Sequence, residues 1–142
     1  MTRAWSTLAV ALAVALAILI PRAEALAADA TPPRELRRFH EIFKELVETN
    51  TTNSSGSCTV AAEAMARRLK QAGYADGDMQ LIVPPDAPTK GNLVVRLKGN
   101  GEKRPLLLVA HLDVVEAKRE DWVRDPFKLI EENGVYYGRG TS

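Results

Sequence analysis

The stretch Leu106-Leu-Leu-Val-Ala-His-Leu-Asp113 is the most informative part of this sequence for the fold. Residues 106–110 are all apolar and follow Pro105, which is typical of a strand covered on both faces within a sheet. Such a strand requires layers of helix around the sheet. On extended backbone, His111 and Asp113 point to the same side. We therefore expect an imidazole and a carboxylate to share one pocket at the strand's carboxyl end, where open α/β sheets usually bind ligands.

The pair His111 and Asp113 is a candidate for metal chemistry. A histidine that ligates a metal usually donates its other ring N–H to a carboxylate, which fixes the direction of the ring. In this interpretation His111 is the metal ligand and Asp113 is the catalytic-site residue that orients it. The alternative is structural, with a histidine that closes a strand and an aspartate that opens a turn. Because short motifs match by chance, the tripeptide alone does not decide between the two.

Three motifs in a fixed order give more context. They are His111-Leu-Asp-Val-Val115, then Trp122 with Asp125-Pro-Phe127, and finally Tyr137-Gly-Arg-Gly-Thr-Ser142. Together they resemble a family of dizinc metallohydrolases that includes acetylornithine deacetylase, succinyl-diaminopimelate desuccinylase, aminoacylase and glutamate carboxypeptidase. The resemblance is strong over about the last forty residues and looser over the helices and strands before them.

This resemblance implies an α/β fold of the zinc-exopeptidase type, with three αβα layers and a mixed sheet. It implies that the intact protein hydrolyses an amide bond in a small peptide or N-acyl amino acid, using a water held between two Zn²⁺ ions and a glutamate base. His111 matches the first zinc ligand of the family, and Asp113 matches the aspartate that orients it. In the family, a bridging aspartate, a Glu-Glu pair and further ligands come after the Gly-Arg-Gly segment, beyond Ser142. A homodimer through a further domain would agree with the resemblance.

The residues of this chain do not supply a complete zinc site. A catalytic zinc ion generally takes three protein ligands, but the only histidines are His40 and His111, and Cys58 is the only cysteine. We expect residues 28–142 to be the truncated amino-terminal part of a catalytic domain, inactive alone. Two other classes stay open, a secreted noncatalytic binding module and an inactive homologue.

The first residues have the pattern of a secretory signal peptide. Arg3 precedes an apolar run from Leu8 to Ile20, and small residues follow. This run is short for a membrane span, which needs about 20 residues. We expect a signal peptide over residues 1–27, export to the periplasm or medium, and no stable membrane span after cleavage. An uncleaved anchor is the alternative, because Pro21 and Arg22 could mark a membrane exit.

The composition excludes some classes of partner. The chain has 142 residues, of which 46% are hydrophobic and 26% charged, values typical of a globular domain. Lys and Arg number 19, and Asp and Glu number 18, so the sequence gives no reason to expect a nucleic-acid partner.

Local patterns predict the elements that surround the central stretch. Apolar residues three and four apart predict an amphipathic helix over residues 34–48, and a polar loop follows over 49–57. A second helix should begin after a Ser57 or Thr59 cap, run through Gln71 and end at Gly73. Its expected buried side comprises Val60, Ala61, Ala64, Met65 and Leu69.

Short strands are expected in the second half of the chain. Residues 79–83 and 92–98 are candidate strands, and Gly99-Asn100-Gly101 should form a turn before the central strand. Strands joined this tightly should pair antiparallel, which would make the sheet mixed. Asn133-Gly134 predicts a tight hairpin between residues 128–132 and 135–137. Trp122 and Phe127 could cover the strand end and exclude water, or could be plain packing. The glycines around Arg139 suggest close approach of the backbone to a neighbour.

Overall fold

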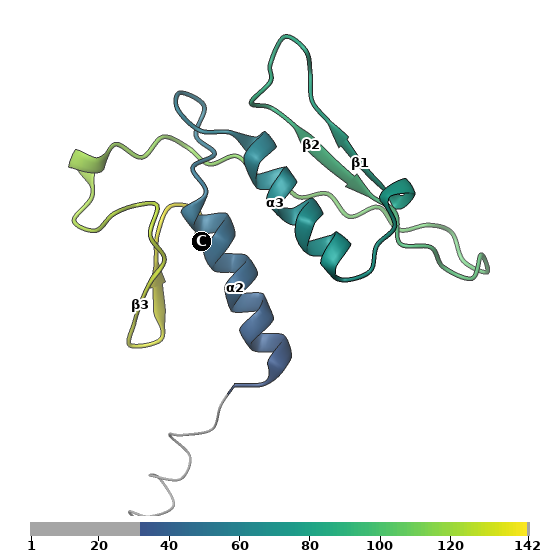
Figure 1. Ribbon diagram of the computed structural model, residues 1–142. Coiled ribbons are helices and arrows are strands. Elements are labelled where there is room, and N and C mark those ends of the chain that lie inside the picture. The colour runs from purple at the N-terminus through teal and green to yellow at the C-terminus, as the bar shows by residue number, and fades with distance from the viewer. Residues whose placement is uncertain (1–31, 142) are drawn as a thin grey trace, which may run out of the picture. The chain divides into compact units, whose positions relative to one another are not determined.

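The computed structural model describes residues 32–141, so the expected signal peptide lies outside the described residues. The described residues from Phe39 onward form one compact unit. Figure 1 shows the elements, which are α2 (Arg34–Glu48), α3 (Cys58–Gln71), η1 (Asp76–Asp78), β1 (Met79–Ile82), β2 (Asn92–Val95), η2 (Arg119–Asp121), β3 (Ile130–Glu132) and β4 (Val135–Tyr137). Within residues 32–141, no helix is long and apolar enough to cross a membrane.

Helix α2 has the predicted bounds, but its apolar stripe is only partly covered. Val47 near its carboxyl end is buried, and the Phe43 ring meets the edge of the Tyr136 ring at a centroid distance of 5.5 Å. Phe39 stacks on Phe43 but stays 63% exposed. The packing of this helix within residues 39–141 is therefore concentrated near its carboxyl end.

Helix α3 confirms the predicted start and end. Ser57 is the N-cap, and its hydroxyl accepts a hydrogen bond from the Val60 amide. The chain leaves the helix through Gly73, whose φ of +97° favours glycine. The predicted burial was wrong for Val60, which is 50% exposed. The small residues of the helix make up its buried face, namely Cys58, Ala61, Ala62 and Ala64.

The two candidate strands before the central stretch are confirmed, though both are shorter than predicted. β1 and β2 are antiparallel, with Met79 opposite Val95 and Ile82 opposite Asn92. This pair packs beside α3, as Figure 1 shows. β2 ends at Val95 instead of Lys98, because beyond this point the chain has no strand to pair with in the described residues and Leu97 is 79% exposed.

The predicted hairpin near the carboxyl end is also confirmed. β3 and β4 pair antiparallel, and Asn133 and Gly134 both have positive φ values, 53° and 75°, as a tight turn of this kind requires. The glycines around Arg139 lie close to other side chains as expected. A Cβ on Gly138 would lie 2.7 Å from Val47 Cγ1, and one on Gly140 would lie 3.0 Å from Val114 Cγ1.

The predicted central strand is not formed. Residues 104–118 have no regular secondary structure, and Leu106, Leu107, Leu108 and Val109 are each 82–84% exposed. A buried strand needs hydrogen-bonded neighbours along both edges and cover on both faces. None of the other described residues supplies such a neighbour. The described part of the chain is thus an α/β arrangement with two separate two-stranded antiparallel sheets.

Candidate functional site

The structure brings His111 and Asp113 together. The Nδ1 atom of His111 lies 3.2 Å from Oδ1 of Asp113 and 2.9 Å from the Asp113 carbonyl oxygen. Both partners are acceptors, so Nδ1 donates the ring hydrogen and Nε2 of the neutral ring keeps its lone pair. The two side chains are 83% and 66% exposed, so Nε2 is accessible to a ligand.

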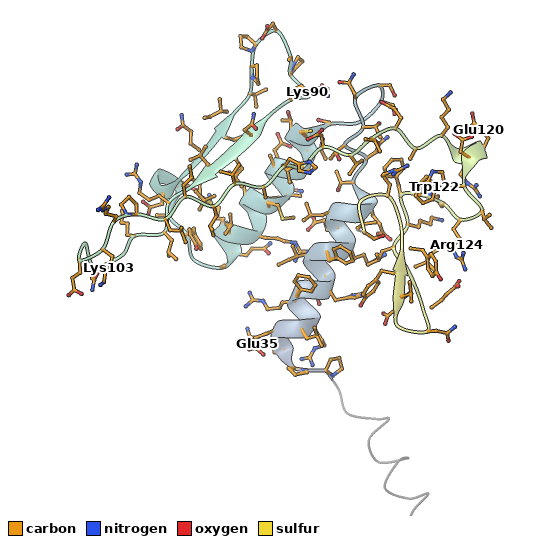
Figure 2. All side chains as sticks on the ribbon, turned by 180° about the vertical axis from the view of Figure 1, so that it is seen from behind. Glu35, Lys90, Lys103, Glu120, Trp122 and Arg124 are labelled. Carbon is orange, nitrogen blue, oxygen red and sulfur yellow. The ribbon has the colours of Figure 1, made fainter. Side chains whose placement is uncertain are left out.

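A cavity of about 620 Å³ lies beside this pair. The segment 110–114, which carries both residues, forms one wall, and α3 contributes Cys58, Ala62 and Met65. The polar residues that line the cavity are His111, Asp113, Asn53, Asn92 and Lys90. Lys90 lies in the connection that leads into β2 and is labelled in Figure 2. The cavity therefore combines an apolar helix face with a few polar groups, as small-molecule sites commonly do.

The loop between α2 and α3 holds the segment that carries the pair. Thr51, only 2% exposed, donates its hydroxyl hydrogen to the Leu112 carbonyl at 2.7 Å. Ser54 donates from its backbone N–H and its hydroxyl to the two carboxylate oxygens of Glu116, at 2.9 and 2.7 Å. The Ser54 hydrogen bonds lower the pKa of the Glu116 carboxyl, because they stabilise its charged form. One loop thus contacts the chain on both sides of Asp113.

The expected aromatic cover lies elsewhere. Trp122 packs against the Arg139 guanidinium, whose carbon lies 4.7 Å from the ring centroid, and Nη2 of Arg139 donates to the Glu116 carbonyl at 3.2 Å. Figure 2 shows Trp122 and Arg124 on the segment that leads to the β3–β4 hairpin. Neither Trp122 nor Phe127 lines the cavity beside His111. In the described residues these aromatics pack the carboxyl-terminal part of the chain.

The residues present fit one metal ligand and its orienting carboxylate. No group of three or more His, Cys, Asp or Glu side chains within residues 32–141 is arranged to hold a metal ion. His40 lies near Glu131, with Nε2 3.9 Å from the carboxylate, and so belongs to the contact between α2 and the hairpin. Cys58 is the buried first residue of α3.

The sequence did not indicate Thr51, Ser54 or Glu116. A stretch of Thr, Asn, Ser and Gly predicts a loop, and it does so correctly, but nothing in it shows that Thr51 is buried. Thr51 and Leu112 are 61 residues apart, and their hydrogen bond joins a side chain to a backbone carbonyl. Every residue has a backbone carbonyl, so the sequence gives no means of identifying Leu112 as the acceptor of the Thr51 hydrogen bond.

A comparison with known protein families finds a match that covers the motifs in the carboxyl-terminal part of the chain. Residues 107–142 match Peptidase family M20/M25/M40, and this match begins within the Leu106–Asp113 stretch. No solved structure matches the chain at a significant level.

Individual relatives extend the match toward the helices. Acetylornithine deacetylase of Vibrio campbellii is 30% identical over 108 residues, which cover 76% of this chain and 28% of that protein. N-formyl-4-amino-5-aminomethyl-2-methylpyrimidine deformylase of Bacillus subtilis is 43% identical over 58 residues, covering 39% of this chain and 14% of that protein. The human N-fatty-acyl-amino acid synthase/hydrolase is 53% identical over 38 residues, 27% of this chain and 8% of that protein.

The chain spans about 28% of the length of the acetylornithine deacetylases that it matches. The 53% identity with the human protein extends over only 38 residues. The family match includes His111, Asp113 and the Gly138–Gly140 segment, and it confirms the resemblance drawn from those motifs. The chain is thus similar to peptidase family M20/M25/M40 over residues 107–142, and to acetylornithine deacetylases over 76% of its length.

Proposed function

We propose that this chain is part of a zinc-dependent hydrolase that cleaves an amide bond in a small peptide or an N-acyl amino acid. The names of its relatives support this proposal, since they describe a deacetylase, a deformylase and an N-fatty-acyl-amino acid synthase/hydrolase. Each of these names refers to an acyl group on the nitrogen of an amino compound. Residues outside this chain would complete the catalytic site.

The observation that carries the proposal is the contact between His111 and Asp113. The carboxylate accepts the hydrogen of Nδ1 and thereby leaves Nε2 as the atom available to a metal ion. The exposure of the ring agrees with this role, because no other described group occupies that side of it.

In the proposed site, His111 would be a ligand of one of two Zn²⁺ ions, and Asp113 would hold its ring at a fixed angle. A bound Zn²⁺ ion supplies a Lewis acid and makes water a better nucleophile near neutral pH. The chain's own contribution is thus one oriented ligand beside a cavity.

We further propose that the apolar run at 106–109 is covered in the longer protein by strands and helices of a three-layered fold. Four neighbouring side chains that are more than 80% exposed form an apolar surface of a kind that soluble proteins seldom leave uncovered.

Export after cleavage behind Ala27 is proposed on the sequence pattern alone. Amino-terminal sequencing of the protein secreted by the native host tests it, and an intact amino terminus would contradict it.

Activity and metal content of the full-length protein test the main proposal. The substrates would be N-acetyl, N-formyl and N-fatty-acyl amino acids and dipeptides, with zinc measured by mass spectrometry. His111→Gln should lose bound metal and turnover, and Asp113→Asn should reduce metal affinity or turnover about 10- to 100-fold. His40→Gln is the matched control, since it changes the other histidine and leaves the candidate site intact.

Two results would contradict the proposal. If His111→Gln kept the zinc content and turnover of His40→Gln, His111 would not be a ligand. If the wild-type protein bound no metal and cleaved none of the substrates, a noncatalytic binding module or an inactive homologue would be the better description.

A further inference from the structure

The segment that carries His111 is attached to the loop between the two helices. Thr51 Oγ1 donates to the carbonyl of Leu112, the residue between His111 and Asp113, over a distance of 2.7 Å. Thr51 is 2% exposed, so water competes little for this hydrogen bond. This hydrogen bond therefore acts on the one residue, Leu112, that separates His111 from Asp113.

A second attachment follows three residues after Asp113. Ser54 binds both carboxylate oxygens of Glu116 through its amide and hydroxyl groups. Arg139 donates to the carbonyl of the same glutamate at 3.2 Å. The backbone from Leu112 to Glu116 is therefore fixed at both ends, although it forms no helix and no ladder.

The loop itself is rigidly built. The Asn50 side-chain oxygen accepts hydrogen bonds from the Thr52 amide at 3.0 Å and the Thr52 hydroxyl at 2.8 Å. The Ser57 amide donates to the Asn50 carbonyl at 2.9 Å, and Ser57 also caps α3. The loop thus connects Thr51 directly to the first turn of a helix.

We propose that Thr51 is a positioning residue that sets the place of His111 through the Leu112 carbonyl. The inference rests on the proposed function, in which His111 is a metal ligand. Such ligands must be held within about 0.5 Å of the productive geometry, and this requires support from surrounding residues. The contact between His111 and Asp113 fixes the ring relative to its own backbone. The hydrogen bond from Thr51 fixes that backbone relative to the helices.

The test compares two threonines whose hydroxyl groups donate to different backbone carbonyls. Thr51→Val removes the hydroxyl that binds Leu112 and keeps the size of the side chain. Thr49→Val is the matched control, because Thr49 Oγ1 also donates to a backbone carbonyl at 2.7 Å, but that carbonyl belongs to Glu45 in α2. Thr51→Ser restores a hydroxyl at the first position. All variants are made in the full-length protein.

The measurements are the affinity for Zn²⁺ and the visible absorption spectrum of the protein loaded with Co²⁺, which reports the geometry of the metal ligands. We expect Thr51→Val to weaken Zn²⁺ binding about 10-fold and to change the Co²⁺ spectrum, as loss of support around a ligand does. Its kcat should fall while KM changes less than about 2-fold, because the substrate contacts stay in place. Thr51→Ser should recover most of the affinity, and Thr49→Val should match the wild type.

Each result decides between positioning and general packing. A Thr51→Val protein with wild-type Zn²⁺ affinity and Co²⁺ spectrum would overturn the inference, as would equal losses in Thr49→Val. If His111→Gln also left zinc binding unchanged, the proposed function would fail first, and the two failures are thus distinguishable. If Thr51→Val does not fold, Thr51→Ala takes its place. It should weaken Zn²⁺ binding about 10-fold, and an unchanged affinity would reject the inference.

Discussion

Gly56 offers the sharpest test of how the loop between α2 and α3 is built. A Cβ on this residue would lie 2.4 Å from the Thr52 amide nitrogen, 2.6 Å from the Asn50 carbonyl oxygen and 2.7 Å from the Asn50 side-chain oxygen. Two of these three atoms are backbone atoms, which cannot rotate away as the end of a long side chain can. Gly56→Ala must therefore move the loop.

The size of the effect follows from the hydrogen bonds at the crowded atoms. The Asn50 carbonyl accepts from the Ser57 amide at 2.9 Å, and the Asn50 side-chain oxygen accepts from the Thr52 amide at 3.0 Å and from the Thr52 hydroxyl at 2.8 Å. Each such bond contributes about 1 kcal/mol net, so loss of all three would lower the free energy of unfolding by about 3 kcal/mol. Partial relaxation of the loop brings the expected loss to about 2–3 kcal/mol.

Urea unfolding of the full-length protein, followed by circular dichroism, measures this loss as a lower midpoint at an unchanged slope. Gly77→Ala is the control, since its Cβ would meet nothing within 4 Å and its φ is not positive. The control should stay within about 0.5 kcal/mol of the wild type. If Gly56→Ala were as stable as Gly77→Ala, the packing described for this loop would be wrong.

Three further predictions concern other parts of the chain. Leu108→Asp in the full-length protein should lower the free energy of unfolding by more than about 3 kcal/mol if strands cover residues 106–109, and a neutral result in urea unfolding would reject the three-layered fold. Ser54→Ala should lower the melting temperature most at neutral pH and progressively less as the pH falls below 4.5, the ordinary pKa of Glu116. The folded-state pKa is lowered, so the stabilisation is present above the unfolded value and is lost as the pH falls through the folded one. A difference that did not shrink as the pH was lowered would contradict this assignment. Gly138→Ala should lower the free energy of unfolding by about 1–3 kcal/mol, because its Cβ overlaps Val47. In a double-mutant cycle, Val47→Ala should recover part of this free energy, and additive losses would contradict the contact between the two residues.

The elements that were predicted well are those whose causes are local. The bounds of α2 and α3 follow from helical periodicity, the Ser57 cap and the left-handed Gly73. The β3–β4 turn follows from Asn133-Gly134, since a two-residue turn needs residues that tolerate positive φ. Each of these signals lies within a few residues of the feature it specifies.

The central strand was predicted wrongly because its existence depends on other segments. Residues 106–110 have the composition of a buried strand, but composition does not provide the neighbours that a strand requires. The site was predicted in part. The spacing of His111 and Asp113 correctly placed the two groups together, and their metal-binding role stays a prediction. The Thr51 contact was missed because it joins residues that are distant in sequence.

The hydrogen bond between Thr51 and Leu112 also bears on the order of events during folding. It closes a loop of 61 residues, and the chain entropy lost on closing such a loop is about 4 kcal/mol. One hydrogen bond contributes only about 1 kcal/mol, so this contact cannot form until other packing has already brought the two regions together. Helices, whose contacts are local, form much earlier. The peptide that presents the imidazole is therefore among the last parts to reach its native position, and any substitution that loosens α3 should release it first.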